Sequence, residues 1–209
     1  FSAKNDPGFV SAMLGEDYVR MTEQNIENGN PFGVYQSGNS FIVWLGIFAN
    51  NTIVALGYFG KGLTLGIFTV TAMVQEAVRI GAFEEFFFAK GYGLTSVLTV
   101  LLHGTLELWS IIIAAVSGVV LPKSFLFPGT MKRFDSLKKG AREGVKLLIG
   151  IVPVLMMAAF IEGFITRYYR MHWAISSSIL LLSASFIIWY FGFYPRQVGK
   201  KIKTGEGAL

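Results

Sequence analysis

The chain has 209 residues, of which 53% are hydrophobic and 15% charged, with a mean hydropathy of +0.53. Soluble domains carry about 25% charged residues, so this composition indicates an integral membrane protein. Cysteine is absent, which excludes disulfides, thiolate metal sites and thiol nucleophiles. The net charge of +5 is uneven, because residues 1–39 carry −3 and the remainder +8. Basic loops between apolar segments are typical of a membrane protein, and we expect no nucleic-acid partner.

Residues 1–39 predict a segment outside the hydrophobic region. Between Phe9 and Glu27, apolar residues such as Met13 and Ile26 are interspersed in a strongly polar stretch. This pattern predicts an amphipathic helix lying on the membrane surface or on the rest of the protein. Residues 28–39 are rich in Gly, Asn and Pro and predict a loop. The sequence begins at Phe1 without a basic n-region, so we expect no signal peptide and a parent chain that extends upstream.

Residues 40–194 predict an all-α, polytopic bundle of about five hydrophobic segments, because about 20 apolar residues suffice to cross a bilayer. The segments are 40–59, a short one at 62–74 that extends to Ile80 if tilted, 95–121, 145–164 and 173–194. The last is edged by aromatic residues, as at a membrane interface. A basic tail, 195–209, follows, and we expect it in the cytoplasm with the 122–146 loop.

The third segment is interrupted by His103-Gly104, which leaves two topologies open. If 95–121 crosses the membrane once, 12 of the 18 Lys and Arg residues lie on one side. If it is a re-entrant hairpin bent at His103-Gly104, 15 of the 18 lie on one side. The hairpin obeys the positive-inside rule better, so we favour it over a broken helix that spans. Gly104 is then the bend in this segment, and Pro153 is a second bend candidate.

Several polar side chains lie within the hydrophobic segments, where such groups are rare and costly. The candidates for a buried polar site are Asn50, Asn51, His103, Glu107 and Glu162. His103 and Glu107 are four residues apart and share one face of a continuous helix. One interpretation is a functional site, such as a proton relay, an ion site or a gate. The plainer interpretation is that these groups hydrogen-bond to each other and fix the helix packing.

Enzyme chemistry has weaker support. His103, Glu107 and Glu162 offer at most three metal ligands, and HxxxE is not the HExxH pattern of a zinc peptidase, so we expect no metal or other cofactor. Glu84-Glu85 with the downstream HxxxE faintly resembles CAAX-type intramembrane peptidases. Lys90 and Glu107 replace the arginine and asparagine of those motifs, and a second motif histidine is not evident. We therefore expect no catalytic residues.

Two further features concern packing and the membrane surface. Gly62 and Gly66 have the spacing that lets membrane helices approach closely, a weak pattern in a chain with 24 glycines. One interpretation of a basic stretch is that it contacts anionic lipid headgroups or a partner. The plainer interpretation is that its positive charges only reflect the side of the membrane on which this loop lies. Its candidate residues are Lys132, Arg133, Lys138, Lys139 and Arg142.

The chain carries an ordered series of motifs: FANNTIVA at 48–55, the glycine-rich turn at 59–66, LHGxxEL at 102–108, Pro128-Gly129 and AxxEGF at 159–164. This series resembles the stage II sporulation protein M family of bacterial integral membrane proteins. Residues 18–35 also resemble the region before the first span in the longer, non-sporulation members. Leu102 and Trp109 depart from the prolines that often flank HG and EL in the family.

The resemblance implies a non-enzymatic subunit of the bacterial inner membrane that works with partners in envelope remodelling. We expect partners among membrane or cell-envelope proteins, and a homo-oligomer, in the simplest case a dimer. The alternative is a transporter or permease-like component in which the five polar candidates line a path for protons, ions or a small solute. Broken helices beside ionisable groups suit that class. A continuous polar cavity would distinguish it from the scaffold.

Overall fold

The computed structural model describes residues 6–36 and 38–204, and these residues form helices and connections without a strand. The order along the chain is α2 (Pro7–Leu14), α3 (Glu16–Glu27), η1 (Gly33–Gln36), α4 (Ser40–Lys61), η2 (Gly62–Thr64), α5 (Ile67–Ala89), α6 (Gly93–Leu126), α7 (Arg133–Phe160), η3 (Ile161–Ile165), η4 (Thr166–Tyr168), α8 (Trp173–Ile187), η5 (Ile188–Phe193) and α9 (Tyr194–Thr204). The all-α prediction is confirmed.

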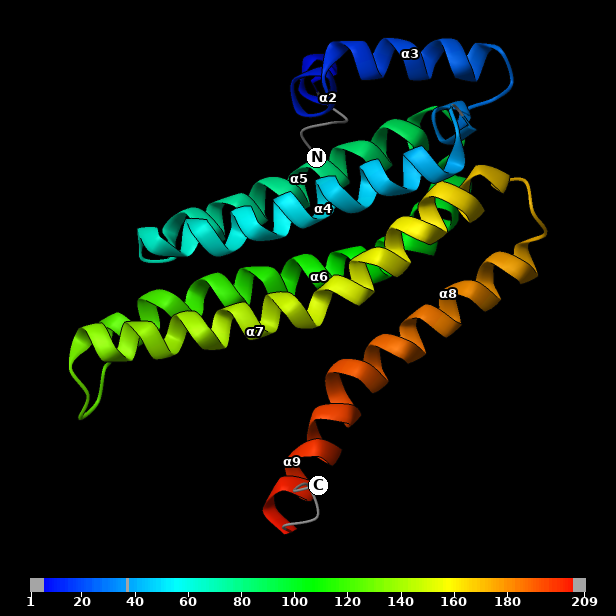
Figure 1. Cartoon of the computed structure of the whole chain (residues 1–209). Coiled ribbons are helices and arrows are strands. Elements are labelled where there is room, and N and C mark those ends of the chain that lie inside the picture. Colours follow the sequence, from blue (N-terminus) through cyan, green and yellow to red (C-terminus); the bar gives the residue numbers. More distant parts are fainter. Residues whose placement is uncertain (1–5, 37, 205–209) are drawn as a thin grey trace.

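Four stretches are long and apolar enough to cross a membrane: Ser40–Thr64, Gly93–Leu126, Arg133–Tyr168 and Trp173–Lys200. They contain four of the five predicted hydrophobic segments. The remaining segment, 62–74, forms η2, the turn after it and the start of α5, and the rest of α5 carries Glu76, Arg79, Glu84 and Glu85. Helix α5 nevertheless runs between the same two ends of the bundle as α4 and α6 (Figure 1).

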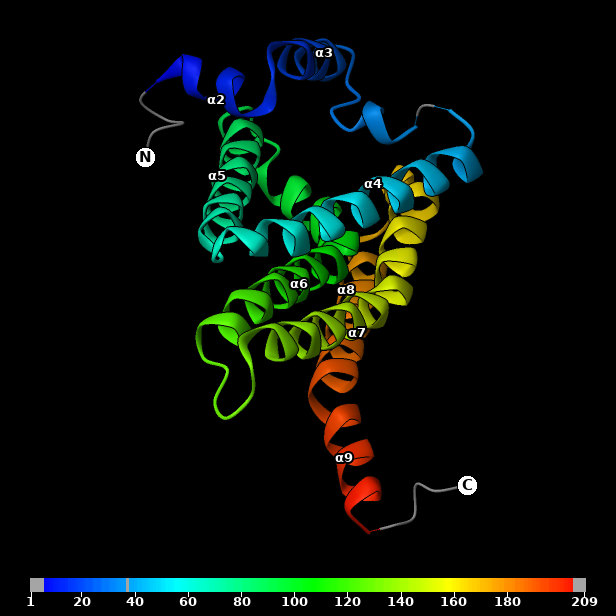
Figure 2. The same cartoon turned by 60° about the vertical axis from the view of Figure 1, so that its left-hand side comes forward.

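Helix α6 overturns the prediction of a re-entrant hairpin. It continues without a break from Gly93 to Leu126, and His103 and Gly104 lie within its regular part. At roughly 1.5 Å per residue its 34 residues extend over about 50 Å, more than a hydrocarbon core requires. Its two ends lie at opposite ends of the bundle in Figures 1 and 2. The loop charges misled the prediction, because the positive-inside rule ranks topologies without reporting backbone geometry.

The second bend candidate, Pro153, also lies inside an uninterrupted helix and faces outward from α7. The irregular backbone that follows α7 comes later, at the π-helical turn η3. A π turn inserts an extra residue and rotates the side chains that follow it. The irregularity therefore falls at Glu162, not at the proline.

Helices α6 and α7 form an antiparallel hairpin through small residues. A Cβ added to Gly140 would lie 2.1 Å from Ser124 Oγ, and one added to Gly144 would lie 3.0 Å from the Ser117 carbonyl oxygen, both in α6. Ser117, Ala114 and Ala115 of α6 are buried in the same region. Small residues let membrane helices approach closely, so packing at these glycines accounts for the hairpin.

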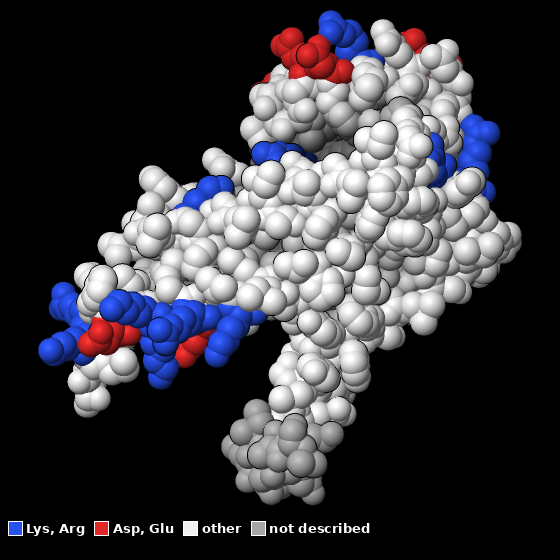
Figure 3. Space-filling view, viewed as in Figure 1, with Lys and Arg blue, Asp and Glu red and all other residues white. Residues whose placement is uncertain are grey.

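The antiparallel pair of α6 and α7 also leaves a shorter loop than the basic loop predicted at 122–146. Helix α6 extends to Leu126 and α7 begins at Arg133, so most of 122–146 is helical. Lys132 is the N-cap residue of α7, and Arg133, Lys138, Lys139 and Arg142 lie exposed on its first turns. Figure 3 shows the blue basic cluster at this end of the hairpin.

The N-terminal segment lies across the opposite end of the bundle (Figure 2). The single amphipathic helix predicted at 9–27 is two helices, because Gly15 adopts a positive φ of 90° between α2 and α3. Val10 and Phe32 pack with Phe86 and Phe87 of α5 in a buried cluster. We call α2, α3 and η1 the N-terminal cap, since this cluster seats them on the bundle.

Helix α8 diverges from the bundle towards the C-terminus (Figure 1). Its contacts with the bundle include Ile187, which is buried with Leu102 of α6 and Val154 of α7. The Tyr190 hydroxyl also donates to the Gly150 carbonyl at 2.9 Å. The predicted basic tail begins within α9, and residues 205–209 lie outside the described part of the chain.

Candidate functional site

Three of the predicted polar residues meet at one place. His103 and Glu107 of α6 and Glu162 of η3 each offer a ligand-type atom, and these atoms lie within 4.8 Å of one another. His103 is buried, whereas Glu107 and Glu162 are partly covered. The i, i+4 spacing on an unbroken helix explains the pairing of His103 with Glu107. We call these three residues the polar cluster.

The hydrogen bonds around Thr166 determine how the His103 ring is oriented. The Thr166 hydroxyl donates to the Ile161 carbonyl at 3.2 Å, so its oxygen is left to accept from His103 Nδ1, also at 3.2 Å. The proton of a neutral ring is therefore assigned to Nδ1, and Nε2 carries the lone pair. Nε2 lies 3.9 Å from Glu162 Oε2. The basic nitrogen of the ring thus faces the carboxylates.

Glu162 reaches the polar cluster because of the π turn. Gly163 sits against α4, where an added Cβ would lie 3.2 Å from Trp44 Cα. The Trp44 indole also donates to the Met156 carbonyl at 3.2 Å. The glycine permits this close approach of η3 to α4, and the wider turn places Glu162 opposite α6.

The two asparagines of α4 separate. Asn51 is 8% exposed, and its side chain interacts with Glu107. Asn50 points to the other side of α4 and is exposed. Asn51 therefore belongs to the surroundings of the polar cluster, and Asn50 does not.

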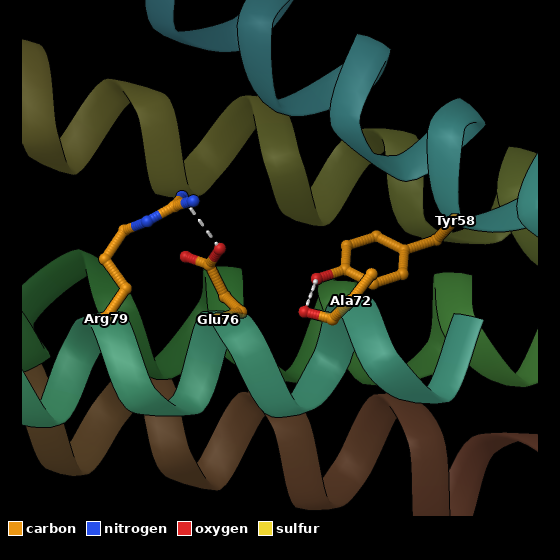
Figure 4. A network of polar contacts seen from close by, with 4 residues as sticks. All are labelled: Tyr58, Ala72, Glu76 and Arg79. Atoms are coloured by element: carbon orange, nitrogen blue, oxygen red, sulfur yellow. Dashed lines mark hydrogen bonds and ion pairs between the residues drawn. The ribbon is translucent and has the colours of Figure 1, made fainter. Parts of the chain in front are cut away.

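Cations near the polar cluster are engaged elsewhere. Arg79 Nη1 pairs with Glu76 Oε2 at 3.0 Å along the surface of α5, next to the Tyr58 hydroxyl bond to Ala72 (Figure 4). Among the described residues, no Lys or Arg forms an ion pair with Glu107 or Glu162. Two carboxyl groups and one imidazole thus share a largely buried site without a compensating side-chain cation.

A cavity of about 690 Å³ reaches the polar cluster from the N-terminal cap. Its lining includes Tyr18 and Tyr35 of the cap, Glu76 and Arg79 of α5, and Glu162. Of the five polar candidates from the sequence, only Glu162 is among its lining residues. The cavity therefore ends at the cluster, and its lining does not extend along Asn50, Asn51, His103 and Glu107.

Tyr35 covers the polar cluster on the cap side, with its ring centroid 6.1 Å from that of His103. Burial raises the pKa of the Tyr35 phenol well above its ordinary value, and the negative charge of Glu162 raises it further. The phenol therefore stays neutral at physiological pH. Its contribution is an apolar ring and a neutral hydroxyl at the mouth of the site.

Arg167, one residue after Thr166, fastens the cap to the bundle. Its guanidinium donates to the Gln36 carbonyl at 2.8 Å and to Ser40 Oγ, while Gln36 Nε2 donates back to the Arg167 carbonyl at 3.2 Å. The sequence prediction missed Tyr35, Thr166 and Arg167. The available indication was position alone, since Thr166 lies four residues after Glu162.

The two packing glycines have different roles. Gly62 touches α6 directly, because an added Cβ would lie 1.9 Å from the Gly118 carbonyl oxygen. Gly66 has a φ of 80° and is the N-cap residue of α5. The two glycines therefore enclose a tight turn between α4 and α5 and do not form one helix face.

Together, the four candidate spans and the polar residues enclosed between them define a polytopic α-helical membrane protein. The model of stage II sporulation protein M matches residues 6–167, which includes the N-terminal cap and the polar cluster. The chain belongs to the stage II sporulation protein M family. No curated protein and no solved structure shows a significant match.

Proposed function

We propose that this protein is a non-enzymatic subunit of the bacterial cytoplasmic membrane that assembles with other membrane or envelope proteins in envelope remodelling. The family supports the class of function, and one surface of α4 supports assembly. The basic end of the α6–α7 hairpin and the C-terminal tail then lie in the cytoplasm, by the positive-inside rule. The N-terminal cap lies on the other side.

The surface that carries the proposal is formed by Gly46, Asn50, Ile53, Gly57 and Gly60, which we call the α4 face. These residues recur at intervals of four and three and lie exposed on one side of the helix. A Cβ added to any of the three glycines would meet nothing within 4 Å. Small residues around an amide are the composition of interfaces between membrane helices.

Asn50 is the strongest single observation for a partner. It lies near the middle of α4, where no water is available to satisfy its amide if the surface faces lipid. A transmembrane helix of a partner protein, packed on the α4 face, would supply both hydrogen bonds and close contact. A second copy of this chain packed in the same way would give the expected homo-oligomer.

The test compares proteins that co-purify with tagged wild type, Asn50→Leu and Gly57→Leu from native membranes. We expect both substitutions to remove partner proteins while leaving the fold intact, because neither side chain contacts the bundle. Gly81→Leu, at an exposed glycine of α5 with similarly open space, is the control. An unchanged set of partners in the two α4 variants contradicts the proposal.

Transport is a second candidate, favoured by the cavity that reaches Glu162. It requires proton or solute flux through protein reconstituted in liposomes, and loss of that flux in Glu162→Gln. Liposomes without flux exclude this candidate and leave the assembly proposal untouched.

A further inference from the structure

We propose that the polar cluster binds one divalent transition-metal ion, of which Zn²⁺ is the type, and that the ion clamps α6 to the end of α7. His103 Nε2 and one carboxylate oxygen each from Glu107 and Glu162 are the protein ligands. The cluster lies at the inner end of the cavity under the N-terminal cap, which gives an ion or a water molecule access from one side.

The orientation of His103 suits a metal ligand. A metal-binding histidine donates its second ring N–H to an oxygen, which fixes the ring and the tautomer. Here Nδ1 donates to Thr166 Oγ1, whose own proton is committed to the Ile161 carbonyl. The lone pair on Nε2 is thereby directed at Glu162, 3.9 Å away. Without a proton or a cation between them, the two groups repel each other.

The charge of the site suits a divalent ion equally well. Glu107 and Glu162 carry two negative charges when ionised, and neither pairs with Lys or Arg within the described residues. Desolvating such a pair is costly unless a cation compensates it. A mixed imidazole and carboxylate set favours Zn²⁺ and neighbouring first-row ions over Mg²⁺ or Ca²⁺, which prefer oxygen alone.

Asn51 lies beside the same site. Its side chain is more than nine-tenths buried and interacts with Glu107. Outer-shell partners of this kind orient the carboxylates and imidazoles that bind a metal ion.

The geometry requires only a small closure. Ligand atoms around tetrahedral Zn²⁺ lie about 3.3 Å apart, given bonds of about 2.0 Å. The three atoms of the polar cluster lie within 4.8 Å of one another, so carboxyl rotations suffice to bring them together. Protein ligands on three sides leave a fourth position for Asn51 or a water molecule.

The test uses the full chain, purified without a polyhistidine tag, stripped with a chelator and reconstituted in nanodiscs. Zn²⁺ is added, free ion is removed, and bound metal is measured by mass spectrometry. We expect one Zn²⁺ per chain, and a Kd at least about 100-fold weaker in His103→Gln, Glu107→Gln and Glu162→Gln. His172→Gln and Glu143→Gln, a histidine and a glutamate outside the cluster, should bind like wild type.

A second measurement uses the wild type alone, so its result does not depend on whether the variants fold. X-ray absorption of the Zn²⁺-loaded protein should show one imidazole among nitrogen and oxygen ligands. Substoichiometric binding by the wild type overturns the proposal, as does a shell with no imidazole. Tight binding retained in both His103→Gln and Glu162→Gln overturns it too.

Discussion

His103 is held by a single side-chain hydrogen bond, and this makes Thr166 the residue on which the orientation of the polar cluster depends. The ring is buried, so loss of its acceptor leaves a buried N–H without a partner. Polar contacts between membrane helices contribute about 1 kcal/mol each, similar to hydrogen bonds in soluble proteins.

Thr166→Val is therefore expected to lower the free energy of unfolding by about 1 kcal/mol, since the isosteric valine keeps the packing and removes the acceptor. Denaturant titration of the detergent-solubilised protein, followed by circular dichroism, measures the change. Ser178→Ala is the matched control, because the Ser178 hydroxyl is exposed and bonds only to its own helix at Ala174. Equal stability of the valine variant and wild type would contradict the proposal that Thr166 orients His103.

At the scale of residues, the sequence predicted which polar residues are candidates for the site better than it predicted which of them contact one another. Helical spacing alone placed His103 and Glu107 on one face. The convergence with Glu162 depends on the α6–α7 packing and on a π turn, and no residue pattern in IEGFI signals such a turn. The split between Asn50 and Asn51 could have been anticipated only in part, since adjacent helical residues point about 100° apart but either one could face the bundle.

At the scale of elements, close contacts between backbones hold the bundle together. The α4–α5 turn touches α6 where Gly62 meets Gly118, and Gly118 in turn lies against the Tyr58 carbonyl, 2.5 Å from the position of an added Cβ. No flexible side chain is available there to move aside, so both positions require glycine.

Gly62→Ala and Gly118→Ala are each expected to destabilise the protein by about 2 kcal/mol or more, because the new methyl group forces two backbones apart. Gly150→Ala provides the comparison, since a Cβ at Gly150 meets nothing within 4 Å and alanine favours the helix. Thermal unfolding in detergent reports all three. Similar midpoints for Gly62→Ala and Gly150→Ala would contradict the close contact.

The helices themselves were predictable, because long apolar runs define them regardless of tertiary structure. Their continuity was not. His103-Gly104 looked like a break, yet a buried glycine in α6 costs little when neighbouring helices pack around it. Gly140 and Gly144, which bring α7 against α6, were not identified, since one GxxxG spacing among 24 glycines carries little information.

For the whole molecule, an unbroken α6 that crosses the membrane would place the N-terminal cap and the basic α6–α7 end on opposite sides. Of the 18 Lys and Arg residues, 12 then belong to the side of the basic end. The re-entrant topology predicted for residues 95–121 would have put the N-terminal cap on that same side. The two arrangements therefore differ in an observable way.

Because the chain has no cysteine, single cysteines can report this topology without background. We expect a membrane-impermeant thiol reagent applied to intact spheroplasts to label Glu27→Cys in the cap and to spare Met131→Cys at the basic end. Both side chains are accessible, since each residue is exposed. Permeabilised cells should label both. Labelling of the two positions from the same side would contradict a spanning α6 and favour the re-entrant topology of residues 95–121.

The proposal that the protein serves as an assembly subunit is tested most directly by photo-crosslinking in native membranes. A photoreactive amino acid at Ile53, 68% exposed in the centre of the α4 face, reports what covers that face. Ile149 of α7, 65% exposed and away from it, is the control. The account predicts a protein adduct from position 53, identified by mass as a partner or a second copy, and lipid adducts alone from position 149. Lipid adducts alone from both positions would contradict it.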